Sequence, residues 1–309
     1  MKIGILCNSK LSLPSIHTLL NLGHTIFMGM PEGSGADDYE IQGFANQFGI
    51  QITRFQKQKL TEELIHWKTF CELETIFVIT FPHILPADLI ARIKIDIVNF
   101  HFASLPDYKG AQPAFWMIKK GEQKGGIAAH LITKEIDGGP IVHFEPYSLS
   151  ENETYNSYMT KMSYLNNRVV QLVLEKMKNS QFQKQLKPQN NSIAVYFKKP
   201  QFSDVRIDWQ KMAAIEIERL CRACNHWNNG ALTSINNFPL KIVEVKMING
   251  NSKNESPGTI LQNLETKEVT VATFDNKQLS IKIAYTEDLG FFSNDKLSEL
   301  GIQAGTRLV

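Results

Sequence analysis

The sequence predicts an α/β protein in which a doubly wound, mostly parallel sheet is followed by a small β-barrel of the OB type. One observation is the opening of the chain, where a buried strand at 2–7, a helix at 14–22 and a second strand at 24–30 follow one another. The other is the last third, where short alternating runs are separated by Gly and Asn turns. We therefore expect an α/β domain at 1–185, a linker rich in Gln and Asn at 186–204, and a C-terminal domain at 205–309.

Apolar runs continue to alternate with amphipathic segments through the first domain, as a βαβ succession requires. The further strands predicted there are 50–54, 75–80, 94–98, 126–133 and 141–147. The further helices predicted there are 41–48, 61–73, 111–120 and 154–177. Between the second strand and the helix at 41–48 lies an acidic loop with the sequence PEGSGADD.

The C-terminal domain is predicted to hold one helix and a set of short strands. The helix spans 213–224, and Cys221 and Cys224 fall on its apolar face together with Ile217 and Leu220. No second Cys pair or spaced His pair completes a zinc site, so we expect packed core cysteines and no metal. The strands are predicted at 240–247, 257–262, 268–273 and 278–284.

The composition is that of an ordinary globular protein, with 43% hydrophobic and 21% charged residues and a net charge of +2. Nothing in this balance requires a nucleic acid or a membrane as partner. No apolar run approaches the roughly 18 residues of a membrane span, and the N-terminal run is too short for a secretory signal. We expect a cytoplasmic protein with reduced cysteines.

Asn99 and His101 are the first candidates for chemistry. They lie two residues apart, so in a strand their side chains leave on the same face. An amide can donate to a developing oxyanion and an imidazole can accept a proton near neutral pH. Asp137, which precedes a glycine turn, can orient or charge that imidazole. His130 fits two interpretations equally well, a satisfied core histidine or a contact to these three groups.

The motifs around these residues resemble those of the 10-formyltetrahydrofolate-dependent formyltransferases, which include methionyl-tRNA formyltransferase and the nucleotide-sugar N-formyltransferases. The segments that carry the resemblance are 99–101, 105–106, Gly110 and 136–141. The resemblance implies that Asn99, His101 and Asp137 are the catalytic triad, with 10-formyltetrahydrofolate as co-substrate and no metal. One departure is Ala103, which stands where the family often has a serine.

The resemblance also implies residues that bind the two substrates, and it covers nearly the whole chain, including the join between the domains. For the folate, the implied contacts are Phe81, Ile84, Leu85, Pro86, Ile136 and Gly138. For the acceptor, they are Lys10, Gly110, Gln112 and Pro113. The glycines after Asp137 are expected to let the backbone approach the pterin closely.

The acceptor is predicted from charge to be the primary amine of a small molecule, such as an amino sugar nucleotide or a biosynthetic intermediate. The family's tRNA enzyme inserts a basic loop after the second strand, whereas here no Lys or Arg occurs from Leu11 to Thr53. An acidic loop repels phosphates. Methionyl-tRNA is the alternative acceptor, and a non-catalytic folate-binding module is a third interpretation. Four cations could still form a basic face in the C-terminal half: Arg222, Lys241, Lys246 and Lys253.

Overall fold

The computed structural model describes residues 1–33, 35–179, 181–262, 268–300 and 302–309. Position 34 of the predicted acidic loop, position 180, and positions 263–267 and 301 of the predicted C-terminal domain lie outside the described residues. The chain divides into two compact units. The first consists of residues 1–113, 124–148 and 159–197, and the second of residues 114–123, 149–158 and 198–309.

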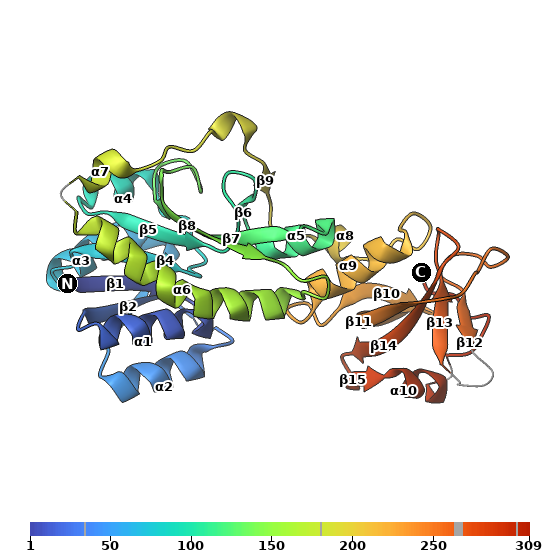
Figure 1. The fold of residues 1–309 in the computed structure, drawn as a ribbon. Helices are drawn as coiled ribbons and strands as arrows, with labels where there is room; N and C mark the ends of the chain where they lie inside the picture. The colour runs from blue at the N-terminus through green and yellow to red at the C-terminus, as the bar shows by residue number, and fades with distance from the viewer. Residues whose placement is uncertain (34, 180, 263–267, 301) are drawn as a thin grey trace. The chain divides into compact units, whose positions relative to one another are not determined.

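The first unit is built on a seven-stranded sheet in the order β3-β2-β1-β4-β5-β7-β8 (Figure 1). Its strands are β1 (Lys2–Cys7), β2 (Thr25–Pro31), β3 (Ile52–Phe55), β4 (Thr75–Ile79), β5 (Ile97–His101), β7 (Lys124–Leu131) and β8 (Ile141–Ser148). The first five in spatial order are parallel, whereas β7 runs antiparallel to both β5 and β8. The predicted doubly wound, mostly parallel sheet is confirmed.

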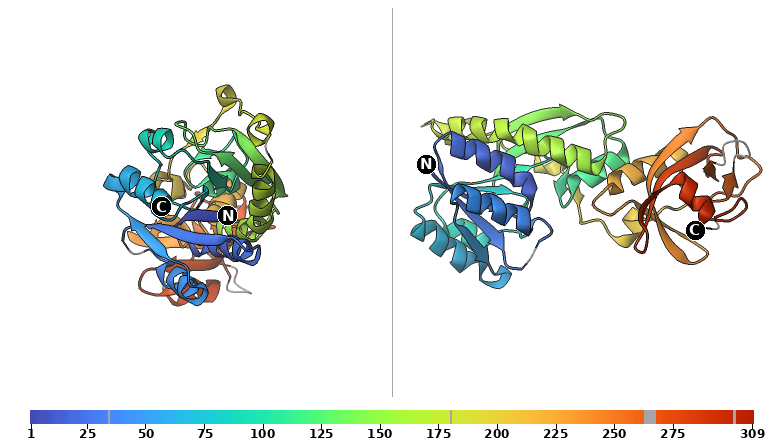
Figure 2. Two further views of the ribbon diagram at one scale, coloured as in Figure 1. Left: turned by 90° about the vertical axis from the view of Figure 1, so that its left-hand side faces the viewer. Right: turned by 90° about the horizontal axis from the view of Figure 1, so that it is seen from below.

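Helices cover both faces of this sheet (Figures 1 and 2). One face carries α1 (Leu13–Asn21), α2 (Asp38–Phe48) and the long α6 (Tyr155–Met177), and the other carries α3 (Leu60–Phe70) and α4 (Ala87–Arg92). Helix α6 is fixed beside α1 because Asn166 Nδ2 donates to Ser15 Oγ at 3.0 Å in the interior. Short 3-10 turns are η1 (Lys10–Ser12), η2 (Lys57–Lys59) and η3 (Asn191–Ile193), and α7 (Phe182–Gln185) is a single turn.

The central strands are apolar on both faces because helices bury both of them. All five residues of β4 are buried, and so are five of the six in β1. Two glycines make room for Trp67 of α3. A Cβ at Gly4 would come within 2.7 Å of the Trp67 ring, and one at Gly29 within 3.2 Å of it. The indole therefore lies directly on the backbone of β1 and β2.

The segment 186–197 is ordered against the first unit. Its strand β9 (Tyr196–Phe197) pairs in parallel with β6 (Lys109–Gly110), and Lys187 forms a bridge with Ile141. Gly110 has a φ of +95°, and a Cβ there would stand 2.1 Å from the Phe197 carbonyl oxygen. This pairing thus requires glycine at position 110.

The second unit has a curled antiparallel sheet in the order β10-β11-β14-β13-β12, with β15 paired to β14. Its strands are β10 (Ala231–Ile235), β11 (Phe238–Ile248), β12 (Ile260–Gln262), β13 (Val269–Ala272), β14 (Gln278–Thr286) and β15 (Gly290–Ser293). The helices are α5 (Pro113–Lys120), which begins at the last residue of the first unit, α8 (Phe202–Val205), α9 (Ala214–Cys224) and α10 (Asn294–Glu299). The predicted OB-like architecture is confirmed. Cys221 and Cys224 are buried on α9, as its apolar face predicts.

The bounds of one strand and several short elements differ from the sequence-based expectation. Strand β5 begins at Ile97 rather than 94, because Lys94 has a φ of +57° and turns the chain, and it extends through His101. Helix α4 and strands β10 and β15 were not predicted; each is six residues or shorter, too brief for periodicity to reveal. In the described parts of the chain, no helix has the length and apolar character needed to cross a membrane.

Phe77 at the centre of β4 is expected to be critical for the stability of the first unit. Its ring is fully buried and meets Phe100 edge to face at 5.1 Å between centroids. Phe77→Ala should lower the free energy of unfolding by about 3–5 kcal/mol, because it leaves a cavity. Urea unfolding followed by circular dichroism measures this loss. Phe70→Ala, which removes a ring that is 70% exposed, should change it by less than about 0.5 kcal/mol. Equal losses in both variants would contradict this description of the core.

Candidate active site

Strand alternation brings Asn99 and His101 to one face at the carboxyl end of β5. The antiparallel register with β7 then sets Asn99 opposite His130 and His101 opposite Ala128. In open α/β sheets, ligands bind beyond the carboxyl ends of the parallel strands. The structure therefore places this pair of polar side chains where such a fold forms its binding crevice.

Asp137 joins them from the turn after β7, where its backbone adopts a φ of +48°. Its side chain is 12% exposed. One carboxylate oxygen, Oδ2, accepts from the Gly110 N–H at 2.9 Å and lies 3.8 Å from His101 Nδ1. The other, Oδ1, accepts from Asn99 Nδ2 at 3.4 Å and lies 3.4 Å from His130 Nε2. The three predicted triad residues are thus brought together around one buried carboxylate.

The pKa of the Asp137 carboxyl lies well below its ordinary value. Burial alone would raise this pKa, but the neighbouring His130 and His101 imidazoles and the Gly110 N–H together outweigh it. Asp137 is therefore an anion throughout the neutral range. It supplies a fixed negative charge to the imidazoles beside it.

His101 is almost completely buried, and its tautomer is fixed by the backbone. Its Nε2–H donates to the Tyr108 carbonyl at 2.6 Å, so Nδ1 is the nitrogen that can accept a proton. Burial lowers the pKa of His101 below the ordinary value, and the nearby Asp137 carboxylate opposes this shift only in part. The imidazole is consequently neutral at pH 7, with its lone pair on Nδ1.

His130 contacts the triad directly, which decides between the two interpretations left open by the sequence. Its Nδ1–H donates to the Leu131 carbonyl at 3.0 Å, so Nε2 accepts from Asn99 Nδ2 at 3.1 Å. The two N–H bonds of the Asn99 amide thus go to His130 and, over a longer distance, to Asp137. The weaker of the two contacts, at 3.4 Å to Asp137, is the easier one for an incoming oxygen to replace.

Polar side chains from the segment 186–197 hold the Asp137 turn from outside. Gln189 Nε2 donates to the carbonyls of both Asp137, at 2.9 Å, and Gly139, at 2.7 Å. Asn191 donates to the Glu135 carboxylate at 2.7 Å and accepts from the buried Lys109 amino group at 2.6 Å. These contacts could not be predicted from the sequence, because a segment rich in Gln and Asn is typical of solvated linkers.

The glycines after Asp137 allow close packing of the turn within the protein. A Cβ at Gly139 would stand 1.9 Å from the Leu131 carbonyl oxygen, and one at Gly138 would lie 2.7 Å from Glu135 Cβ. Glycine is therefore needed at position 139 for the turn to pack against β7. This requirement exists whether or not a ligand is bound.

The predicted folate-binding residues occupy two loops at the ends of β4 and β7. Ile84 and Ile136 are large apolar side chains that are 68% and 41% exposed. Leu85, by contrast, is buried in the core, so only its backbone can meet a ligand. Phe81 is partly buried and packs on His83, and Pro86 caps the start of α4.

The predicted acceptor-binding residues differ in whether their polar groups already have partners within the protein. Lys10 follows β1, and its amino group pairs with Asp37 and Glu40 at 3.6 and 2.9 Å. Gln112 has a φ of +51°, and its Oε1 is buried without a hydrogen-bond partner among the described residues. Pro113 begins α5. Of this group, Gly110 donates to Asp137 of the predicted triad, and the buried Gln112 Oε1 can still accept a hydrogen bond.

The acidic loop after β2 is partly neutralised by the two cations that flank it. Lys10 pairs with Asp37 and Glu40, and Arg54 pairs with Asp38 at 3.0 Å. From position 10 to position 54 the chain has four acidic and two basic side chains, so the net charge of this region is negative.

Arg222, one of the cations considered for a basic face, is mostly buried between Glu218 and the Glu153 carbonyl. Within the described ranges, no cluster of His, Cys, Asp and Glu side chains suited to a metal ion is present.

Two family models match the chain. One, described as formyl transferase, matches residues 40–174, and the other, the formyl transferase C-terminal domain, matches residues 201–288. Together they span well over half of the sequence. Among curated relatives, the methionyl-tRNA formyltransferase of Sulfurihydrogenibium sp. is 27% identical over 315 residues, with 99% of both chains covered. That of Staphylococcus aureus is 27% identical over 244 residues, with 78% of this chain and 76% of the relative covered.

Solved structures with the same fold include HypX from Aquifex aeolicus in complex with tetrahydrofolic acid. Its TM-score is 0.69 at 15% identity, and the match covers 97% of this chain but 47% of HypX. Another is the N-formyltransferase from Helicobacter canadensis in complex with folinic acid and dTDP-3-aminofucose. Its TM-score is 0.66 at 19% identity, with 91% of this chain and 98% of that chain covered.

The two hydrogen bonds of Gln189 are expected to stabilise the Asp137 turn. Gln189→Leu leaves the two carbonyls without their donor, so the free energy of unfolding should fall by about 1–3 kcal/mol. Urea unfolding measures the loss. The matched control is Gln183→Leu, which removes an exposed amide whose partner among the described residues is the Asp96 carboxylate, and it should change stability by less than about 0.5 kcal/mol. If both variants are as stable as the wild type, Gln189 does not hold the turn.

Proposed function

Because the chain belongs to the formyl transferase family, we propose that it transfers the formyl group of 10-formyltetrahydrofolate to the primary amine of a small molecule. The observation that supports this best is the single buried carboxylate of Asp137, which holds the Asn99 amide and the His101 imidazole together. One group can donate to an oxyanion and the other can accept a proton. Transfer of an acyl group to nitrogen needs both functions.

The reaction begins when the unprotonated amine of the acceptor attacks the formyl carbon. A C–N bond forms, the carbonyl oxygen becomes an oxyanion, and the amine nitrogen carries a proton that it must lose. Collapse of this species breaks the bond to the folate nitrogen, which leaves with a proton as tetrahydrofolate. The protein therefore has to stabilise one negative oxygen and move one proton.

Asn99 is proposed as the donor to the oxyanion. Its amide reaches the site already oriented, since His130 Nε2 fixes one N–H at 3.1 Å. The second N–H leaves its longer contact with Asp137 and turns to the oxyanion. Loss of one such donor typically costs about 10²–10³ in rate.

His101 is proposed as the proton acceptor. Because Nε2–H is bonded to the Tyr108 carbonyl, Nδ1 takes the proton from the attacking amine. The imidazolium that forms lies 3.8 Å from the Asp137 carboxylate, which stabilises its charge. Asp137 is thus a positioning and charge-compensating group and does not itself carry the proton.

The folate is proposed to bind between the loops after β4 and β7. Ile84 and Ile136 expose apolar surface there, which a pterin ring can cover. Phe81 offers a ring edge, while Leu85, Pro86 and Gly138 offer backbone groups. Support also comes from the folate-bound neighbours, HypX and the Helicobacter enzyme.

The acceptor is proposed to be an amino sugar nucleotide or a similar small amine. The stretch from Lys10 to Arg54 keeps its excess of negative charge after its ion pairs are counted, which disfavours the phosphates of a tRNA stem. The Gln112 amide oxygen, buried without a described partner, is suited to accept from an N–H or O–H of the acceptor. Lys10, Gly110 and Pro113 remain proposed neighbours of this substrate.

Methionyl-tRNA is the second candidate acceptor. It is favoured by the end-to-end match with the Sulfurihydrogenibium methionyl-tRNA formyltransferase. A non-catalytic folate-binding module is the third candidate, and it would bind folate without releasing tetrahydrofolate.

Asp137→Asn should lower kcat by orders of magnitude and shift its acidic limb to lower pH. His101 must be neutral to act, so kcat falls as pH drops through its pKa, which burial places below the ordinary value of about 6.5. The Asp137 charge raises this pKa, so its removal lowers the pKa further. The measurement is kcat against pH at saturating substrates, so that ionisation of the free amine does not enter.

The control for this profile is Asp107→Asn, which removes an exposed carboxylate from the loop after β5. It should leave both kcat and the acidic limb unchanged. An acidic limb that moves to higher pH in Asp137→Asn would contradict the proposed roles, as would a kcat within a few-fold of wild type.

The acceptor is tested by comparing substrates under one assay. Purified protein is mixed with 10-formyltetrahydrofolate and either a nucleotide-linked amino sugar or charged initiator methionyl-tRNA at physiological salt, and tetrahydrofolate release is followed. We expect turnover with the amino sugar nucleotide and little with the tRNA. Efficient formylation of the tRNA would replace the small-amine proposal with the second candidate. Folate binding without release in a wide panel of amines would favour the third.

A further inference from the structure

Tyr196 of β9 brings an aromatic ring to the Asp137 site from the segment 186–197. Strand β9 is fixed in place by its parallel pairing with β6. Neighbouring side chains of a strand leave on opposite faces. Phe197, the other residue of β9, stacks on Tyr108 with ring centroids 5.1 Å apart. The ring of Tyr196 therefore lies on the face of β9 that is turned away from this stack.

The hydroxyl end of this ring lies beside the backbone that holds the Asp137 carboxylate. A Cβ at Gly110 would stand 3.2 Å from Cε1 of the Tyr196 ring, and the Gly110 N–H donates to Asp137 Oδ2 at 2.9 Å. Cε1 is bonded to the carbon that carries the hydroxyl. Partial burial and then the negative charge of Asp137 raise the pKa of Tyr196. The phenol is therefore protonated at neutral pH and can donate a hydrogen bond.

Both the ring and the hydroxyl of Tyr196 are open to a ligand. The residue is 54% exposed, and across the described ranges of the chain its hydroxyl forms no hydrogen bond. A tyrosine ring packs against apolar groups, while its hydroxyl bonds a polar partner. Tyr196 thus presents a flat apolar surface and a hydrogen-bond donor beside the groups proposed to react.

Gln112 presents a complementary acceptor next to the same strand pairing. The Ala111 N–H donates to the Phe197 carbonyl at 2.9 Å, which places Gln112 directly after the paired residues. Its Oε1 is buried and has no hydrogen-bond partner among the described residues. The amino group of Lys109 on β6 is bonded to Asn191 at 2.6 Å. The phenol and the amide are neutral groups, which suit a ring that carries hydroxyls better than a phosphate.

We propose that Tyr196 binds the amine-bearing sugar ring of the acceptor. The face of the phenol ring packs against the C–H groups of the sugar, and the hydroxyl donates to a sugar oxygen beside the reacting amine. Gln112 Oε1 accepts from another sugar hydroxyl. This inference rests on the proposed function and adds a residue that selects an amine on a sugar ring over an amine on an amino acid.

The test compares Tyr196→Ala and Tyr196→Phe with the wild type, and the probe is dTDP-3-aminofucose, whose amine stands between two ring hydroxyls. Calorimetry measures the Kd of the probe, and initial rates give kcat and both KM values. Tyr196→Ala, which loses the ring and the hydroxyl, should raise the Kd and KM of the probe about tenfold or more. Tyr196→Phe, which keeps the ring, should raise them only about threefold. In both variants kcat and the KM for 10-formyltetrahydrofolate should stay within about twofold of wild type, because the phenol touches neither the formyl group nor the folate.

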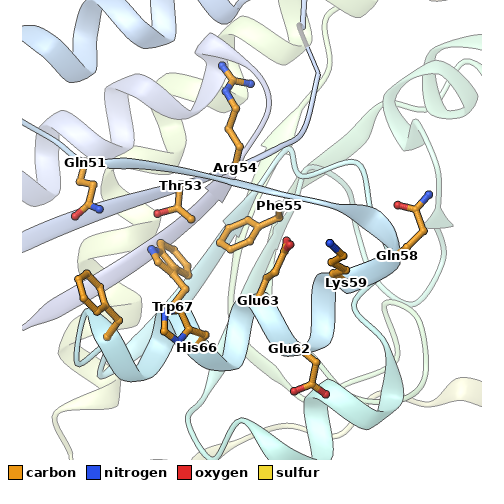
Figure 3. Close-up of a pocket in the computed structure, with 11 residues that line it drawn as sticks. Gln51, Thr53, Arg54, Phe55, Gln58, Lys59, Glu62, Glu63, His66 and Trp67 are labelled. Atoms are coloured by element: carbon orange, nitrogen blue, oxygen red, sulfur yellow. The ribbon is translucent and has the colours of Figure 1, made fainter.

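The control is Phe70→Ala, which removes an exposed ring from the cavity between β3 and α3 (Figure 3). Strands β2, β1 and β4 separate β3 from β5 in the sheet, so this change should leave every constant as in the wild type. Circular dichroism checks that all variants are folded.

Three results would overturn the role of Tyr196: an unchanged Kd of the probe in Tyr196→Ala, a rise confined to the KM for the folate, or no binding of the probe by the wild type. Turnover of another amine would in each case still support formyl transfer. Absence of turnover with every amine would instead contradict the proposed function, whatever the calorimetry shows.

Discussion

The rest of the proposed site depends on the contacts of the buried Asp137 carboxylate. A carboxylate at this depth would be costly without partners, and it finds them in the Gly110 N–H, the Asn99 amide and two imidazoles. These partners come from three separate parts of the chain. The charge therefore fixes the end of β5, the loop after it and the turn after β7 in one arrangement.

The turn that bears Asp137 is held from both sides. On the inner side Gly139 allows the backbone to approach Leu131, where any side chain would collide with the carbonyl oxygen. On the outer side Gln189 bonds two carbonyls of the turn. Gly110, whose N–H donates to the Asp137 carboxylate, also pairs with Phe197 of β9. The segment 186–197 therefore also contacts a residue that is bonded directly to that carboxylate. This segment is therefore part of the site that it borders.

The sequence predicted the fold class and the N-formyltransferase family because both rest on local signals. The apolar strands were visible as runs, and Asn99, His101 and Asp137 stood within short motifs. The contacts of Gln189 and Asn191 could not be predicted, since they depend on where a polar segment returns in space. His130 remained undecided for a similar reason, because only the register between β5 and β7 sets it opposite Asn99. Leu85 was predicted to line the pocket largely through its backbone, and its side chain is buried in the core.

The central claim is that His101 is a neutral base whose proton is kept on Nε2 by the Tyr108 carbonyl. The most direct measurement is the ¹⁵N chemical shifts of the His101 ring nitrogens in the labelled protein, assigned with His101→Asn and followed with pH. The account predicts the Nε2–H tautomer at pH 7 and protonation of Nδ1 at a pH below about 6.5. An Nδ1–H tautomer, or a ring that is already protonated at neutral pH, would contradict it.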